Sequence, residues 1–304
     1  MKNNVIVILG PTGIGKSDLA IKLAKHLNSE IISADSMQIY KGLDIGTGKV
    51  TKEEQSIVKH HLLDIKEFNE EYSVKEFVDD AHIVINKLLQ NKIIPIIIGG
   101  TGLYIKALVE GYTFYNTNKV IDIRQSINEM IDEKGLDYAY NKLIELDKNK
   151  AQKINKNDKK RIIRAFEILL SNNENSQGKI NKNDVNYIIF ALNMNRENLY
   201  KKINNRVDKM FSLGLEKEAS HYLTLAKQKD FQSLKAIGYK EFKPYIDNLC
   251  DIESVKDSIK QNSRRYAKRQ LTWLRGMNDI IWINIDETDA FENILSTLKN
   301  KEVI

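Results

Sequence analysis

The chain has 304 residues, of which 42% are hydrophobic, and it carries a formal net charge of +6. This length is enough to bury a sizeable core and suits one large domain, or a core that carries a smaller one. No apolar run approaches the roughly 20 residues that a membrane-spanning helix needs, and the only cysteine, Cys250, can form no internal disulfide. We therefore expect a cytoplasmic, monomeric protein without a membrane segment, an export signal or a zinc site.

The first third of the chain alternates predicted strands with predicted helices. Apolar runs at Val5–Leu9, Ile31–Ile32 and Ile93–Ile98 are typical of buried parallel strands. A glycine-rich loop and a helix with leucines at helical spacing follow the first run, and a helix is expected over residues 74–90 before the third. This alternation predicts an α/β fold whose core is a parallel, P-loop NTPase-like sheet.

The middle of the chain differs in composition from both ends. Residues 115–184 are rich in Lys, Asn and Asp and contain helical patches such as "DKKRIIRAFEILL". We interpret them as a helical insertion domain, so that the core comprises residues 1–114 and 185–304. Within it, residues 171–186 are expected to form a mobile loop. The remaining expected elements are strands at Tyr187–Leu192 and Ile280–Ile285 and helical regions over 196–228 and 254–276.

The loop "GPTGIGKS" fits the phosphate-binding pattern G-x-x-x-x-G-K-[ST]. Such a loop points backbone N–H groups at phosphate oxygens at the N-terminus of the next helix. Its lysine supplies a positive charge, and its last hydroxyl can bind a magnesium ion that bridges phosphate oxygens. The position between an apolar strand and a helix favours this interpretation over a loop that only turns the chain. The predicted members are Gly10, Pro11, Thr12, Gly13, Ile14, Gly15, Lys16 and Ser17.

Two polar residues follow the next two strands. Asp35, in "SADSMQIY", and Thr101, in "GGTGLY", should lie at the sheet edge where open parallel sheets bind ligands. Asp35 can act there as a general base or hold a metal, and a helix cap is the alternative. The Thr101 hydroxyl can bind a phosphate or cap the following helix, and its residue type alone favours the cap.

Positive charge gathers in two runs. Nine Lys or Arg face three acids between Lys142 and Arg164, and seven face one acid between Lys256 and Arg275. One such run fits a solvated helix face equally well, but two together favour a polyanionic partner.

Several histidines and aromatic residues are expected to be structural. His60 and His61 are adjacent, so on a strand they face opposite sides, and the sequence offers no third metal ligand. Tyr266, Trp273 and Trp282 are expected in the core.

Long stretches of the sequence resemble one family. "ISADSMQIYKGLDIGTGK", "PIIIGGTGLYIKAL", "NDKKRIIRAFEI" and "RRYAKRQLTWLR" follow "GPTGIGKS" in the order found in bacterial tRNA dimethylallyltransferases, up to about Arg275. The resemblance implies transfer of a dimethylallyl group from dimethylallyl diphosphate to the adenosine immediately 3′ of the anticodon in tRNA. It also implies that the glycine-rich loop holds the diphosphate, with Mg²⁺ on Ser17, rather than the phosphates of ATP.

The resemblance further implies roles for individual residues. Lys16 and Arg206 would stabilise the departing diphosphate, Asp35 would accept a proton from the adenine amine, and Thr101 would help to hold the diphosphate or the reacting group. Residues implied to contact tRNA are Asp35, Ser36, Met37, Gln38, Thr101, Arg124, Lys160, Arg161, Ile162, Ile163, Arg164, Lys235, Gly238, Tyr239 and Lys240. The resemblance also implies that the adenosine is extruded into a channel that the diphosphate enters from the opposite side, which agrees with the rule that base chemistry needs an unstacked base.

Two other functions fit parts of the sequence. A prenyltransferase acting on free adenine nucleotides would not need the basic insertion, and a P-loop kinase would turn over ATP without a prenyl donor. The segment after Phe114 lacks the prolines usual in the family, which bears on the alignment of Arg124.

Overall fold

The computed structural model describes residues 3–112, 117–170 and 185–304. The chain divides into two compact units, one formed by residues 1–110 with 184–304 and the other by residues 111–183. The expected loop at 171–186 lies almost entirely outside the described residues. No helix in the described ranges is long and apolar enough to cross a membrane.

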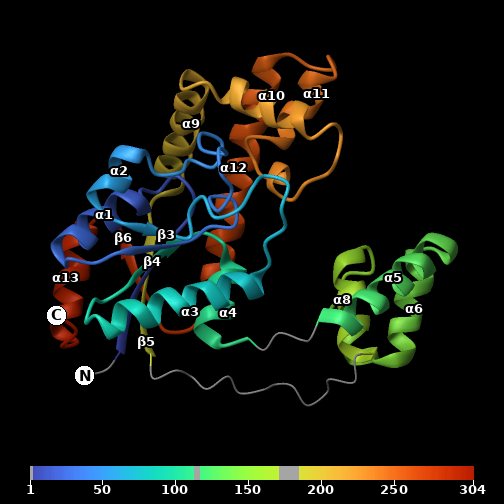
Figure 1. Ribbon diagram of the computed structural model, residues 1–304, viewed down its shortest axis with the longest axis horizontal. Helices are drawn as coiled ribbons and strands as arrows, with labels where there is room; N and C mark the ends of the chain where they lie inside the picture. Colours follow the sequence, from blue (N-terminus) through green and yellow to red (C-terminus); the bar gives the residue numbers. More distant parts are fainter. Residues whose placement is uncertain (1–2, 113–116, 171–184) are drawn as a thin grey trace. The chain divides into compact units, whose positions relative to one another are not determined.

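A parallel sheet of six strands forms the centre of the larger unit (Figure 1). Its order is β3-β2-β4-β1-β5-β6, and every described pairing is parallel. The expected P-loop-like α/β core is therefore confirmed. The strands are β1 Asn3–Leu9, β2 Ile31–Ala34, β3 His60–His61, β4 Ile96–Gly99, β5 Val185–Asn193 and β6 Ile280–Asn284.

The central strands are buried at successive positions, as expected for a sheet covered on both faces. Val5, Ile6, Val7 and Ile8 of β1 are fully buried, although their side chains alternate between the two faces. Each such side chain contributes roughly 1.5–3 kcal/mol by leaving water. The helices of this unit are α1 Lys16–His26, α2 Lys52–Ile57, α3 Val74–Gln90, α4 Gly102–Glu110, α9 Arg196–Ser212, α10 Leu215–Leu225, α11 Lys243–Ile246, α12 Ile252–Leu274 and α13 Ala290–Asn300. Of these, α10 contacts α9 and lies away from the strands (Figure 1).

Two elements differ from their expected bounds for local reasons. The helical region predicted over 196–228 comprises two helices, because Gly214 adopts a left-handed conformation with φ 100° between α9 and α10. The predicted strand at Ile93–Ile98 begins only at Ile96, after Pro95, which has no N–H to donate to a neighbouring strand.

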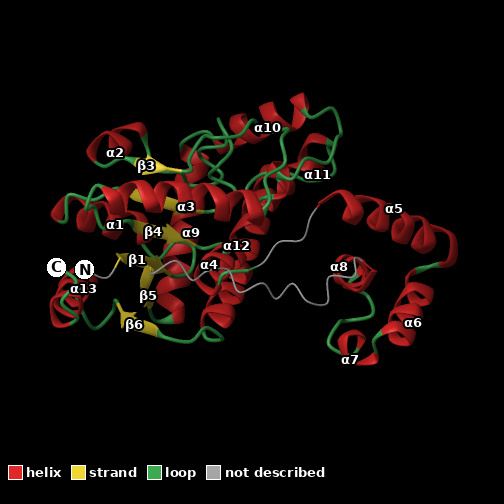
Figure 2. Cartoon of the chain, turned by 60° about the horizontal axis from the view of Figure 1, so that its bottom comes forward, coloured by secondary structure: helices red, strands yellow, loops and turns green. Residues whose placement is uncertain are grey.

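The smaller unit is helical (Figure 2). Its helices are α5 Thr117–Lys134, α6 Leu136–Leu146, α7 Lys148–Ala151 and α8 Lys159–Leu170. They enclose a separate apolar core that includes Ile127, Leu143, Ile162 and Phe166. An independent core is what a helical insertion domain requires.

The ends of β1, β2 and β4 meet at one edge of the sheet because these strands are parallel neighbours. Val7 of β1 pairs with Ile97 of β4, and Ile97 pairs with Ile32 of β2. The glycine-rich loop, Asp35 and Thr101 follow these three strands, so the fold brings them to the same edge.

Gly99 tests how closely this edge is packed. A Cβ at Gly99 would lie 2.3 Å from the carbonyl oxygen of Ala34 in the neighbouring strand. We expect Gly99→Ala to destabilise the protein by about 1–3 kcal/mol, measured as a lower urea midpoint. Gly276→Ala is the control, because its Cβ would meet nothing closer than 3.4 Å. Equal urea midpoints for Gly99→Ala and the unsubstituted protein would contradict this packing.

Candidate functional site

The loop of residues 10–17 turns from β1 into α1 and presents the helix N-terminus to a cavity. Gly15 is the N-cap of α1, with φ 106°, a conformation that side chains disfavour. The Lys16 amine folds back over the loop, where its Nζ donates to the carbonyl oxygens of Gly10 and Pro11, each at 2.9 Å. Helix dipole, loop amides and amine together favour an anion at this place.

A second cation reaches the same place from α9. The Arg206 guanidinium donates to the Thr12 hydroxyl at 3.4 Å and to the Thr47 carbonyl oxygen at 3.2 Å. Burial, and to a lesser extent the Arg206 charge, lower the pKa of Lys16 to about 8, although the Asp35 charge opposes the shift. Burial also lowers the pKa of Arg206. Two desolvated cations beside a helix N-terminus form a site for a strongly charged anion.

The turn after β2 is tied to the turn after β4. The Ser36 N–H donates to the Thr101 hydroxyl at 3.0 Å, and the Met37 N–H donates to the Asp35 carboxylate at 2.9 Å. The Thr101 hydroxyl in turn donates to the Ser36 hydroxyl at 3.3 Å. These bonds fix Asp35 and Thr101 beside each other at the sheet edge.

Two cavities adjoin at these residues. The first, of about 500 Å³, is lined by the glycine-rich loop, Lys16, Ser17 and Gln38. The second, of about 310 Å³, is lined by Ser36, Met37 and apolar side chains of α9 and α12, with Lys235, Lys240 and Arg269 also in its lining. Both are lined by Thr12, Asp35, Thr47, Arg206, Met210 and Tyr266. A reactant in one cavity can therefore meet a reactant in the other beside Asp35.

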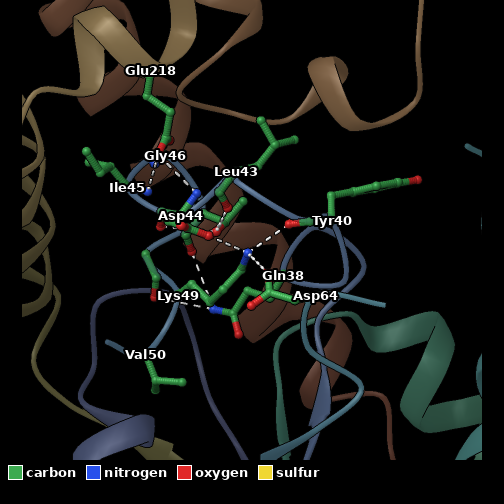
Figure 3. A network of polar contacts seen from close by, with 12 residues as sticks. Gln38, Tyr40, Leu43, Asp44, Ile45, Gly46, Lys49, Val50, Asp64 and Glu218 are labelled. Carbon is green, nitrogen blue, oxygen red and sulfur yellow. Dashed lines mark hydrogen bonds and ion pairs between the residues drawn. The ribbon is translucent and has the colours of Figure 1, made fainter. Parts of the chain in front are cut away.

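The loop between β2 and α2 forms one wall of the first cavity and is held from both sides (Figure 3). Buried Lys49 donates to the Tyr40 carbonyl oxygen at 2.7 Å and pairs with Asp44 and Asp64 at 2.5 and 2.6 Å. On the other side, the Glu218 carboxylate accepts from three successive N–H groups, those of residues 44–46. This loop carries the Thr47 carbonyl that orients Arg206, so the two anchors support the site.

Comparison with known proteins assigns the chain to a family. The family model described as IPP transferase matches residues 38–277. The protein belongs to the IPP transferase family. Its relatives include tRNA dimethylallyltransferases from Alkaliphilus oremlandii, 42% identical over 97% of this chain and 95% of that one, and from Clostridioides difficile, 42% identical over 99% and 96%.

Solved structures agree with this assignment to the IPP transferase family. The full-length tRNA isopentenylpyrophosphate transferase of Bacillus halodurans has a TM-score of 0.73 and 38% identity, covering 99% of this chain and 96% of that one. A eukaryotic dimethylallyltransferase described as acting on tRNA has a TM-score of 0.82 and 29% identity, covering 98% and 80%. The resemblance stated from the sequence is confirmed.

The residues expected to bind tRNA fall into three groups: residues that line a cavity, residues buried in the larger unit, and residues of the smaller unit. Ser36, Met37, Lys235 and Lys240 line the second cavity. Gln38 instead lines the first cavity, and its side chain donates to the carbonyl oxygens of Thr47 and Gly48 in the loop between β2 and α2. The Tyr239 side chain is fully buried and donates to Glu218 at 2.6 Å, and the Gly238 N–H donates to Glu241. The Tyr239 side chain therefore has a packing role in this structure, and the RNA contact expected of this residue stays a prediction.

The third group lies in the smaller unit, on α5 and α8. Lys160, Arg161 and Arg164 are exposed. Arg124 and Arg164 both pair with Glu167, whose side chain is fully buried. Ile162 and Ile163, also expected to contact tRNA, have buried side chains in the core of this unit. Any RNA contact by these two residues would involve backbone atoms.

Some residues of the site lie outside the set that the sequence predicted. Tyr266, expected in the core, lines both cavities, and burial raises its pKa to about 12, which keeps it neutral. Gln270, one helical turn later, lines the first cavity. The sequence signal for these two residues was their spacing: residues four apart on a helix lie on the same face, so Tyr266 and Gln270 face the same place. Trp282, also expected in the core, is 41% exposed on the edge strand β6.

No group of three or more His, Cys, Asp or Glu in the described ranges is arranged to hold a metal ion. His60 Nδ1 lies 2.8 Å from the Val58 carbonyl oxygen, and His61 contacts Glu30, which agrees with their expected structural roles.

The lowered pKa of Lys16 makes anion binding depend on pH. Below about pH 8 the amine is protonated and attracts an anion, and above that value it loses its charge. We expect affinity for inorganic diphosphate to fall above pH 8 relative to Lys16→Arg, whose side chain stays charged, by up to about tenfold per pH unit. Calorimetric titrations of both proteins at each pH give the ratio of their two affinities. The ionisation of diphosphate itself affects both proteins equally and cancels in this ratio. A ratio that does not change with pH would refute the assignment.

Proposed function

We propose that the protein is a tRNA dimethylallyltransferase, which moves a dimethylallyl group from dimethylallyl diphosphate to the exocyclic amine of the adenosine 3′ of the anticodon. The observation that carries this proposal is the pair of adjoining cavities, of which one is cationic and bordered by the glycine-rich loop. The other combines apolar walls with Lys235, Lys240 and Arg269. The names of the relatives support the same activity.

The cationic cavity suits the diphosphate. When the allylic C–O bond breaks, its electron pair passes to the diphosphate, and negative charge grows on the oxygen that leaves. The Lys16 and Arg206 side chains are already held at this place by their bonds within the site. Preorganised donors of this kind stabilise the transition state more than the ground state.

Asp35 suits the role of general base. The adenine amine attacks the allylic carbon, a C–N bond forms, and a proton leaves the nitrogen for the Asp35 carboxylate. Thr101 lines neither cavity, but its hydrogen bonds to Ser36 help to fix the turn that carries Asp35. Because an adenine amine is a weak nucleophile, much of the rate enhancement must come from holding both reactants in contact.

The second cavity suits an extruded adenosine. Lys235 and Lys240 of its lining can bind phosphates of the flanking nucleotides, while apolar walls receive the base. The exposed cations of α8, Lys160, Arg161 and Arg164, with Arg124 of α5, supply further positive charge to an RNA partner.

Magnesium fits the first cavity as a cofactor. Mg²⁺ is usually held by one or two protein oxygens together with substrate phosphates and water, and the Ser17 hydroxyl lies in the cavity lining. When bound, the ion would neutralise charge on the diphosphate.

The direct test is to incubate the protein with magnesium, dimethylallyl diphosphate and an anticodon stem-loop, and to weigh the RNA. We expect the RNA to gain one C5H8 unit and an equal amount of diphosphate to appear. A stem-loop with guanosine at the target position is the control and should gain nothing. Prenylation of AMP but not of the stem-loop would indicate a free-nucleotide enzyme, and ATP turnover without a prenyl donor would indicate a kinase.

Replacing the proposed base separates chemistry from binding. We expect Asp35→Asn to lower kcat by about 10²–10⁴-fold, because the amide cannot accept the proton, while the stem-loop still binds. Asp79→Asn is the matched control, since Asp79 is an exposed residue of α3 that pairs with Lys75 away from both cavities. Near-normal turnover by Asp35→Asn in single-turnover assays would remove Asp35 from this role.

A further inference from the structure

Gln270 is a buried polar residue on α12, within the run "RRYAKRQLTWLR", and the sequence alone predicted no role for it. Its side chain is only 7% exposed, which is unusual for glutamine, and it packs against the glycine-rich loop. A buried polar group is stable only when its hydrogen bonds are satisfied. The partners of this amide therefore indicate what it does.

The Gln270 amide bridges two segments that are far apart in the sequence. Its Oε1 accepts from the Thr12 N–H at 2.8 Å, and its Nε2 donates to the Gly100 carbonyl oxygen at 2.9 Å. One partner can only donate and the other can only accept, so the orientation of the amide is determined. The fit is close, because a Cβ on Gly100 would lie 2.2 Å from Nε2.

Each bridged segment leads directly to a reacting group. Thr12 lines both cavities, and its hydroxyl accepts from Arg206. Gly100 precedes Thr101, whose hydroxyl holds the turn that carries Asp35. The amide thus connects the segment that faces the leaving group with the segment that faces the base.

We propose that Gln270 is a positioning residue for the transfer reaction, which sets the spacing between the diphosphate loop and the Asp35–Thr101 edge. This inference rests on the function proposed above. It requires one donor and one acceptor at position 270, not merely a side chain of this volume. A displacement of about 1 Å between two reactants can reduce the rate by a factor of about 100, so the bridge matters for turnover.

The Gln270→Glu substitution provides a specific test. When ionised, the introduced carboxylate would direct an acceptor at the Gly100 carbonyl oxygen and break the bridge, whereas a protonated carboxyl restores one donor and one acceptor. The charged and titratable groups that border this place are Lys16 on α1, Asp35 after β2, Arg206 on α9, and Tyr266 with Arg269 on α12. These groups are also present in the unsubstituted enzyme. The ratio of the Gln270→Glu activity to the unsubstituted activity at each pH therefore removes, to first order, the effect of their own titration.

The experiment measures kcat/KM for the stem-loop over a range of pH with Gln270→Glu and Gln270→Met. We expect Gln270→Met to lose about 10–100-fold at every pH, because it keeps the volume but has neither donor nor acceptor. For Gln270→Glu, the ratio to the unsubstituted enzyme should rise at least about tenfold as pH falls through the carboxyl pKa. The matched control is Gln232→Glu, since Gln232 donates to the Tyr72 carbonyl oxygen and lines neither cavity.

Two outcomes would overturn the proposal: a ratio for Gln270→Glu that stays constant with pH, or a Gln270→Met enzyme as active as the unsubstituted one. Thermal unfolding at each pH provides a second readout, because the unfolding temperature of Gln270→Glu should also recover toward the unsubstituted value as pH falls. If the unfolding temperature does not recover, the bridge does not depend on a hydrogen-bond donor at position 270, and the proposal is wrong. Failure of the proposed function is distinguishable, since the unsubstituted enzyme would then not prenylate the stem-loop.

Discussion

The burial of two cations around one phosphate-binding loop is the constraint on which the rest of the site depends. Within the described part of the chain, Lys16 and Arg206 donate to backbone carbonyls and a hydroxyl and pair with no carboxylate. Burial disfavours their charged forms, as the lowered pKa values of both groups indicate. This arrangement is unfavourable until an anion binds, and an anion that gains charge during the reaction is stabilised most.

The fold maintains this arrangement from several directions. Parallel pairing brings the ends of β1, β2 and β4 to one edge, and α9 contributes Arg206 to the lining of the same cavity. Glu218 on α10 and Lys49 fix the loop between β2 and α2, which orients the Arg206 guanidinium. Gln270 on α12 connects the glycine-rich loop with the segment after β4. Glu218, Gln270 and Arg206 each bond residues that are distant in sequence, so the geometry of the site depends on several elements of the larger unit.

Sequence was informative where local patterns carry the signal. The apolar runs and the glycine pattern predicted the sheet and the phosphate loop, and the strand ends predicted that Asp35 and Thr101 share one edge. Arg206 came only from family resemblance, because a single arginine on a polar helix has no distinguishing pattern. Glu218, Tyr266 and Gln270 lie on helices whose contacts with the site are set by tertiary packing, which one sequence does not reveal.

The same limit explains why the sequence did not place several other residues in the fold. Gly214 interrupts a helical pattern that periodicity alone would continue, and Tyr239 is buried beneath a loop whose path no local pattern predicts. Ile162 and Ile163 share a helix with exposed cations, but their side chains form the core of the smaller unit.

The central claim is that the loop of residues 10–17 holds the leaving group of a prenyl donor while an extruded adenosine enters through the other cavity. A crystal structure of the protein with an unreactive thiolo analogue of dimethylallyl diphosphate, an anticodon stem-loop and magnesium tests this most directly. We expect diphosphate density at the loop amides, Lys16 and Arg206, and the adenine amine beside Asp35. The claim would be contradicted if the analogue bound elsewhere and the loop of residues 10–17 took up only ATP. It would also be contradicted if the target adenosine remained stacked in the RNA.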